Sequence, residues 1–564
     1  MVSPVLSAPQ KPQTESAAQE NSNDLSPLRV TTHLVQVNVI VNDKHGNPIT
    51  GLAQKDFSIL DNGKPQEIRV FSAETNLPSA LPRDPLPPGT YTNRPEEQSN
   101  APASVTVILL DALNTEPADQ AQARQQVIRV LQELQPQQYV ALYWLGDRLR
   151  ILHEFTTDVA TLRGVLAGLG SKPSRELDNS ELGDPSLDSP NPSTPMGQAF
   201  ERQQFRLTAA QRAANESKRD RVRNTVAAFA AIAHHLGSRK GRKNLVWVSG
   251  SFPVALGYDR FDLNWTSETG YEFGPDVQRA ARTLTDAEIA VYPVDARGLV
   301  GSDSTAAGDE FGNDSEDVGD PEASLPKRAP PESFDTMRLL AERTGGRAFY
   351  GTNNISGAIR RAMDDARVTY TLGYYPASIK WDGTFHEIKV KVAVPGVEVR
   401  ARTGYFAVPD AATASPKGDR AFISQLATSR LPATGIGLLV RTQIARDTGA
   451  PILTAEVHLD LHEVQMQHKE GSWIGTLQSV FLQLDGTGHI LQVDDRTFYP
   501  AFNASTFERA LQSGMSDTRQ VHLLPQAAEL CIVVRDAATA QIGSIYLPLA
   551  QYSSDSSKAN RTKD

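Results

Sequence analysis

The chain has 564 residues, a formal net charge of -10 and 39% hydrophobic residues, a length that allows about three domains with well-buried cores. The negative charge argues against a nucleic-acid-binding protein, because phosphate contacts need a broad basic surface. Cys531 is the single cysteine, so an intramolecular disulfide framework and a multi-cysteine zinc site are excluded. Its apolar neighbours predict a core thiol.

Residues 1–27 are rich in Gln, Ser, Asn and Pro and predict a flexible leader. They lack the basic start and the apolar core of ~7 to 15 residues that a secretory signal peptide needs. This composition is typical of the flexible leader of an exported mature chain. The alternative is that the start codon has been placed too far downstream. No apolar run in the sequence reaches the ~18 residues needed to cross a bilayer, so we expect no transmembrane segment.

Residues 28–75 predict a small β domain. Apolar residues largely alternate from Leu34 to Val41, and the pair Asn62-Gly63 supplies the positive φ angles of a tight hairpin turn. Residues 76–104 then contain seven prolines and show no periodicity, which predicts a Pro-rich linker.

From residue 105 the pattern alternates between buried strands and amphipathic helices, which predicts a doubly wound α/β domain of the Rossmann type over 105–376. The expected strands are 105–110, 139–145, 149–155, 244–249 and 289–295, and the expected later helices are 276–287, 333–344 and 355–366. Segments 171–200 and 301–328 interrupt this pattern and predict mobile insertions, because both lack periodicity. In such a sheet Asp111 lies at the carboxyl end of a central strand.

The C-terminal third returns to short β segments. Residues 377–408 predict a β extension and residues 409–420 a second linker. Short strands separated by turns then predict a β-sandwich over 421–550, and residues 551–564 a flexible tail.

The stretch Val105-Thr-Val-Ile-Leu-Leu-Asp-Ala-Leu-Asn-Thr115 resembles the first strand and metal loop of a von Willebrand factor A domain. Four later motifs are similar to successive landmarks of the von Willebrand A-related proteins of the acidobacterial type: Gly241 to Gly250, Val291 to Gly298, Leu340 to Gly346 and Tyr370 to Pro376. Together with flanking motifs, the resemblance covers about residues 28 to 408. It implies a von Willebrand A-like domain after the small N-terminal β domain, and the β-sandwich predicted from strand spacing follows at the C-terminal side.

In that family an Asp-x-Ser-x-Ser motif holds a divalent cation, and the resemblance implies a metal site here at Asp111, Asn114 and Thr115. The motif is degenerate, since Leu113 stands at a hydroxyl position. The expected fourth strand ends near Ser249 without a carboxylate. Each missing oxygen ligand must be replaced by water, so any binding of Mg²⁺ is expected to be weak.

Structural uses of the same residues stay open beside the metal. Asp111 can serve as a turn or cap acceptor, and Asn114 can cap the helix that begins near Pro117. Thr156 or Thr157 can substitute for a missing metal ligand, although Thr-Thr-Asp before a helix is more simply an N-cap.

Other candidate chemistry is weaker. His458, Asp460 and His462 share one face of a predicted strand, which suits either a zinc site or, more simply, a solvated surface. No nucleophile, base and orienting group assemble in the sequence, so we expect no enzyme.

These observations favour a non-enzymatic protein-binding or adhesion module of the cell envelope with a degenerate metal-ion-dependent adhesion site. The alternative is a metal-independent structural scaffold for an envelope complex. By resemblance the protein is extracytoplasmic, and its partner is a protein or another envelope component. The identity of that partner and the oligomeric state stay open.

Overall fold

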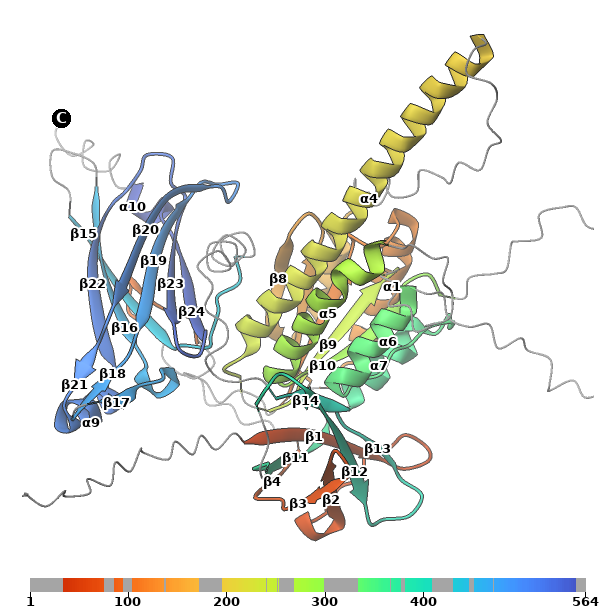
Figure 1. The fold of residues 1–564 in the computed structure, drawn as a ribbon, viewed down its shortest axis with the longest axis horizontal. Coiled ribbons are helices and arrows are strands. Elements are labelled where there is room, and N and C mark those ends of the chain that lie inside the picture. Colours follow the sequence, from red (N-terminus) through yellow and green to blue (C-terminus); the bar gives the residue numbers. More distant parts are fainter. Residues whose placement is uncertain are drawn as a thin grey trace, which may run out of the picture.

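The computed structural model covers the whole chain, and the residues whose placement it describes form the three parts of Figure 1. These residues are 34–75, 86–94, 104–135, 138–171, 195–239, 241–250, 252, 268–298, 333–365, 367–376, 381–407, 430–445, 451–469 and 471–553. The predicted leader, the 409–420 linker and most of the two predicted insertions and of the C-terminal tail lie outside them. Within the described residues, no helix is both long and apolar enough to cross a membrane.

A five-stranded mixed sheet forms the centre of the α/β domain. Its order is β10 (Ile289–Asp295), β9 (Lys243–Ser249), β6 (Val105–Asp111), β7 (Val140–Leu145) and β8 (Leu149–Thr156). Neighbouring strands are parallel except β8, which is antiparallel to β7. Every residue of β6, β9 and β10 is buried, as expected of strands covered on both faces. The predicted central position of β6 is confirmed.

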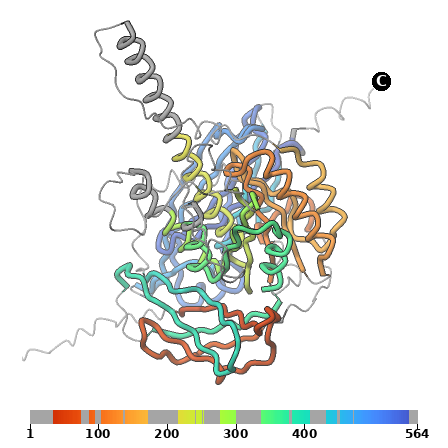
Figure 2. Tube along the Cα trace, turned by 90° about the vertical axis from the view of Figure 1, so that its right-hand side faces the viewer, coloured from red at the N-terminus to blue at the C-terminus, as the bar shows by residue number. Residues whose placement is uncertain are grey.

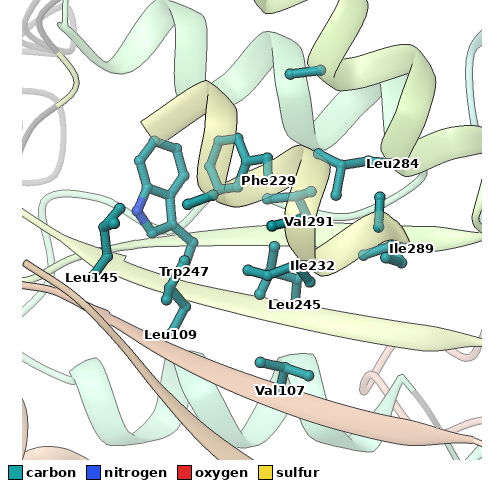
Figure 3. Close-up of a cluster of buried hydrophobic side chains, with 14 of the residues drawn as sticks. Val107, Leu109, Leu145, Phe229, Ile232, Leu245, Trp247, Leu284, Ile289 and Val291 are labelled. Atoms are coloured by element: carbon teal, nitrogen blue, oxygen red, sulfur yellow. The ribbon is translucent and has the colours of Figure 1, made fainter. Parts of the chain in front are cut away.

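Helices cover both faces of this sheet. One face packs against α4 (Pro195–Leu236), α5 (Glu268–Asp286) and α6 (Ser333–Thr344), and the other against α1 (Pro117–Gln132), α2 (Val159–Ala167) and α7 (Ile355–Asp364). Because side chains alternate along a strand, Val107 and Leu109 enter the first core and Ile108 and Leu110 the second. Figure 3 shows the first core around Trp247.

A separate β module joins the N-terminal strands to the segment that follows α7. Its first sheet has the order β13 (Glu398–Arg400), β1 (Val35–Asn42), β11 (Val368–Tyr374) and β4 (Val70–Thr75). Its second has the order β14 (Gly404–Phe406), β12 (Phe385–Val392), β2 (Phe57–Asp61) and β3 (Lys64–Gln66). Both sheets contribute to one core, and Figure 2 shows the red N-terminal and teal later strands interleaved.

The expected end of the α/β domain at residue 376 is therefore wrong. Strand β11 pairs with β1 and β4 and takes no part in the five-stranded sheet. The apolar residues of β11 alternate with Thr369, Thr371 and Gly373, yet every residue of the strand is buried. Burial therefore does not separate β11 from the parallel strands of the α/β sheet, whereas its pairing with β1 and β4 does.

The C-terminal module contains two antiparallel sheets over a shared core. One has the order β22 (Met515–His522), β16 (Ile452–Leu459), β15 (Leu438–Ala445) and β5 (Thr90–Thr92); the other has the order β20 (Ile490–Phe498), β19 (Leu477–Leu484), β23 (Glu529–Asp536) and β24 (Ile542–Pro548). Smaller elements complete the module: β17 (Gln467–Lys469), β18 (Ser472–Ile474), β21 (Ala501–Phe502), α9 (Ala504–Ser513) and α10 (Ala550–Ser553). Cys531 is fully buried in β23, which confirms the predicted core thiol, and burial raises its pKa to about 12.

Strand β5 comes from the middle of the predicted Pro-rich linker. It pairs antiparallel with β15, and the two residues after it, Asn93 and Arg94, are 2% and 5% exposed. The segment is too short and too polar to be recognised as a strand from its own pattern. The prediction that residues 76–104 only connect two domains is thus wrong for residues 90–94.

Candidate functional site

The residues of the predicted metal site do lie together. Asp111 is the last residue of β6, opposite Leu145 of β7, and the chain turns over the carboxyl edge of the sheet to bring Asn114 and Thr115 beside it. All three side chains are buried, with exposed fractions of 2%, 1% and 2% for Asp111, Asn114 and Thr115. The site is thus an interior cluster.

The carboxylate of Asp111 is surrounded by donors from the protein. Its Oδ2 accepts hydrogen bonds from Trp247 Nε1, Ser249 Oγ and Asn114 Nδ2, each at 2.8 Å. Its Oδ1 accepts one from the backbone N–H of Asn114 at 3.1 Å. The indole of Trp247 is fixed in turn by edge-to-face contacts with Phe229 and Phe252. The predicted use of Asp111 as a turn acceptor is confirmed by the Asn114 N–H bond.

Asn114 connects the turn to helix α4. Its Oδ1 accepts from Arg221 Nε at 3.0 Å, and its Nδ2 also donates to Thr225 Oγ1 at 2.9 Å. Arg221 and Thr225 are four residues apart on one face of α4, and both are buried. Asn114 does not cap α1, whose N-cap is Glu116 and has no side-chain cap bond, so that prediction is wrong.

The hydroxyl of Thr115 is also used within the protein. Thr115 Oγ1 accepts the backbone N–H of Gly250 at 2.8 Å, and Gln120 Nε2 donates to the Thr115 carbonyl at 2.7 Å. A Cβ on Gly250 would lie 3.0 Å from the carbonyl oxygen of Asn114, so the two loops approach closely at this glycine. The end of β9 and the turn after β6 are therefore packed directly against each other.

Burial dominates the electrostatics of the site. It raises the pKa of Asp111 above the ordinary value, while the hydrogen bonds from Asn114, Trp247 and Ser249 act in the opposite direction. The buried guanidinium of Arg221 supplies positive charge through Asn114. The Asp111 carboxylate is thus held by N–H and O–H donors, and the cationic side chain of Arg221 contacts one of these donors, Asn114.

This donor set does not fit a metal ion. A divalent cation needs lone pairs directed at it, whereas the groups directed at Asp111 are two N–H donors from side chains, one backbone N–H and one O–H. Leu113, at the missing hydroxyl position, is fully buried in the core. Within the described part of the chain, no three His, Cys, Asp or Glu side chains gather as metal ligands.

The substitute ligands expected from sequence lie elsewhere. Thr156 pairs with Val140 at the start of β7, whereas Asp111 is opposite Leu145 at the end of β7. Thr156 and its neighbour Thr157 therefore lie at the opposite end of the strands from Asp111. There Asp158 caps α2 by accepting the N–H groups of Ala160 and Thr161, as the N-cap alternative predicted.

A second carboxylate, Asp295, ends β10 at the same edge as Asp111. Burial raises its pKa, and Arg297 opposes this with a bond from Nε at 3.1 Å and one from its backbone N–H. Asp295 is therefore paired with a cation of its own.

The other polar candidates are distributed over the C-terminal module. His458 Nδ1 is 3.0 Å from Ser516 Oγ, while Asp460 caps a short 3₁₀ helix and binds Nδ1 of His462 at 2.7 Å. The strand ends at Leu459, so these residues do not form one continuous strand face. They line a cleft of about 280 Å³ with Arg94, which sequence reasoning did not connect to them.

Sequence reasoning also missed Trp247, Arg221 and Thr225. The spacing of Arg221 and Thr225 on a helix was a usable signal, because polar residues at i and i+4 on an otherwise apolar face indicate a buried polar contact. Arg242, directly before β9, is another buried polar residue: it is 2% exposed and donates to Tyr292 and to the Gly345 carbonyl.

No protein-family model and no curated protein matches the chain. Among solved structures, an aerotolerance-related membrane protein from Bacteroides fragilis is similar over 47% of this chain and 98% of its own, at 10% identity and a TM-score of 0.24. A von Willebrand factor type A protein from Catenulispora acidiphila is similar over 87% of this chain and 72% of its own, at 10% identity and a TM-score of 0.23. A pilus adhesin from Lactobacillus rhamnosus GG is similar over 84% and 57%, at 11% identity and a TM-score of 0.25.

Von Willebrand A domains thus occur among the structural neighbours, whereas the acidobacterial type finds no support there. At these TM-scores the likenesses carry no further argument. The description of this region as a doubly wound α/β domain rests on its own sheet order and on the helices that cover both faces of the sheet.

Proposed function

We propose that the protein is a non-enzymatic protein-binding or adhesion module of the cell envelope, and that its binding does not depend on a metal ion. The closed network at Asp111 is the observation that carries the metal independence. Both carboxylate oxygens accept hydrogen bonds from protein groups, and the three residues of the motif are buried. A cation at this position would have to displace these donors before it could meet a partner carboxylate.

The same network supports the absence of catalysis. Ser249, the hydroxyl nearest to Asp111 on β9, is fully buried and donates to the carboxylate. A nucleophile must reach a substrate and be activated by a base, and a hydroxyl enclosed in the core does neither. We therefore assign Ser249 and Asp111 a structural role that holds the loops at the carboxyl edge of the sheet.

The test is capture of partners from native envelope extracts by the full chain, with chelator in one arm and millimolar magnesium in the other. We expect the same captured proteins in both arms. A partner that is lost with chelator and restored by magnesium would overturn metal independence. Recovery of no protein above a control of similar charge, in either arm, would overturn the binding module itself.

A metal-independent scaffold is the second candidate, because a contact between the α/β domain and the C-terminal module would keep two binding surfaces at a fixed spacing. The end of α4 binds the C-terminal module, because Thr434 N donates to the His234 carbonyl at 2.9 Å and Thr434 Oγ1 to that of His235 at 3.0 Å. A scaffold holds two or more partners at once, whereas an adhesion module needs one. Cross-linking mass spectrometry of the captured complex distinguishes them by the number of different proteins linked to one chain.

A further inference from the structure

Residues 87–94 include β5, the edge strand of one sheet of the C-terminal module, and Tyr91 of this strand packs against the core of the module. Thr90, Tyr91 and Thr92 pair with Arg441, Val440 and Leu439 of β15. Two further backbone hydrogen bonds extend this short ladder. Thr442 N donates to the Gly89 carbonyl at 2.9 Å, and Asn93 N donates to the Leu438 carbonyl at 3.3 Å. Adding an extended segment to an exposed sheet edge is a common mode of peptide recognition.

Asn93 provides the most specific contact of this segment. Its Nδ2 donates to the carbonyls of Ala433 and Ile436 at 2.7 and 2.8 Å, and its Oδ1 accepts from Leu438 N at 2.8 Å. These bonds satisfy three backbone groups of a loop about 340 positions further along the chain. An aspartate at this position would direct an oxygen at two carbonyls, so the pocket selects an amide.

Arg94 fills a site shaped for a guanidinium. Its Nε donates to the Thr434 carbonyl at 2.9 Å and its Nη2 to the Gly435 carbonyl at 3.1 Å. A Cβ on Gly437 would lie 3.1 Å from Nη1, so the glycine leaves room for the planar head group. The carboxylates of Asp460 and Glu463 are 3.9 and 3.8 Å away. Lysine has neither the fork of donors nor the flat shape.

The groove continues beyond the segment that occupies it. A cleft of about 280 Å³ lies beside it, lined by Thr92 and Arg94 of the segment and by Gly437, His458, Asp460 and Gly514 of the module. The loop that holds Asn93 and Arg94 is itself fixed to the α/β domain, where Pro432 O is 2.8 Å from His235 Nδ1. A preformed groove with unfilled length is suited to a ligand longer than the resident strand.

We propose that this groove is a recognition site for an extended segment of a partner protein that carries an Asn-Arg pair, and that residues 87–94 are its resident occupant. The partner segment adds to β15 in place of β5, places its amide and guanidinium among the carbonyls of residues 433–436, and continues into the cleft. This inference rests on the proposed protein-binding function and names the surface and the chemistry of the partner.

The test uses a synthetic peptide with the sequence of residues 87–94, blocked at both ends, and the full chain in two forms. In the Asn93→Ala/Arg94→Ala variant the resident segment has lost its anchors, so the groove is open to the peptide. We expect this variant to bind the peptide at least about tenfold more tightly than the wild type, in which the occupant competes. Peptides with Asn→Asp or with Arg→Lys should each bind at least about tenfold more weakly, because buried partners are left unpaired.

Circular dichroism and thermal unfolding test whether the Asn93→Ala/Arg94→Ala variant is folded. If this variant does not fold, Arg94→Lys is used in its place. No peptide binding to a folded, opened chain, or equal binding of the Asn→Asp peptide, would overturn the groove. An engineered pair, Thr92→Cys with Leu439→Cys, gives an independent readout because these residues are directly opposed. The oxidised form should bind neither peptide nor groove-dependent partner, and binding that survives oxidation would also overturn the proposal.

The experiments distinguish a failure of the groove proposal from a failure of the proposed protein-binding function. Capture of envelope proteins that is unaffected by the cysteine lock, together with no peptide binding, rejects only the groove. Peptide binding without any captured protein supports the groove and rejects the wider envelope function.

Discussion

The carboxyl edge of the α/β sheet and the β15 edge of the C-terminal module both contain buried polar side chains, yet they differ in what they bind. At the first, Asp111 and Asn114 are satisfied by elements of the same domain, chiefly β9 and α4. At the second, the carbonyls of residues 433–436 are satisfied by a segment from a distant part of the chain. The first set of bonds holds the loops of one domain together, whereas the second holds a segment that comes from outside the module, which is why we propose the second as a recognition site.

The largest effect is expected at Asp111. Replacing Asp111 by Ala leaves two side-chain N–H donors, a hydroxyl and a backbone N–H without their acceptor, which we expect to lower the free energy of unfolding by about 3 to 5 kcal/mol. Urea unfolding measures the change. Ser249→Ala, which removes a single donor, serves as the control at about 1 kcal/mol. Equal, small effects for both variants would mean that this edge of the sheet is not a closed network.

A smaller effect is expected in the groove. Asn93→Ala leaves two carbonyls and the N–H of Leu438 unpaired, and we expect a loss of about 1 to 3 kcal/mol in the stability of the C-terminal module. Amide exchange of β15 reports it locally. Arg441→Ala is the matched control, because Arg441 is exposed on the same strand. Loss of protection across the α/β sheet as well would show that the two regions unfold together.

Helix α4 reaches both regions, and its end contains a histidine that reports on pH. Burial lowers the pKa of His234 to about 4 from an ordinary value of 6.5. The unfolded chain then binds a proton below pH 6.5 that the folded chain does not bind until about pH 4. Stability is therefore unaffected above pH 6.5 and is lost as the pH falls toward 4, by on the order of 2 kcal/mol.

Thermal unfolding between pH 7 and pH 4 measures this loss, and His234→Gln should reduce the slope. An unchanged slope in His234→Gln would assign the pH dependence to other groups.

The smallest expected effect is that of magnesium. Because the donors around Asp111 do not fit a cation, millimolar magnesium should stabilise the folded chain by no more than about 0.4 kcal/mol, which is the effect of a Kd equal to the concentration added. Calorimetry with wild type and Asp111→Ala measures it, and any heat of binding should vanish in the variant. Tight binding that survives Asp111→Ala would place a metal elsewhere, and tight binding lost in the variant would mean that the Asp111 network opens to receive it.

The sequence predicted the parts of the molecule that depend on local periodicity. The strands and helices of the central sheet, the position of Asp111 and the Asp158 cap follow from patterns within about 20 residues, and the structure confirms them. The tight turn at Asn62-Gly63, with φ of 47° and 77°, is of the same kind, because its conformation is a property of the dipeptide.

Tertiary structure alone decided the pairings. β11 pairs with β1 across more than 300 residues, and Thr90 to Thr92 become a strand only because β15 offers an edge and residues 433–438 offer unpaired backbone groups. The fit of Asp111 to a metal was decided in the same way, since the motif contains the acceptor, whereas its donors Trp247 and Ser249 come from a distant strand. Periodicity fixes which face of an element is buried. Hydrogen bonds between distant residues fix what that face meets, and no pattern along the chain records them.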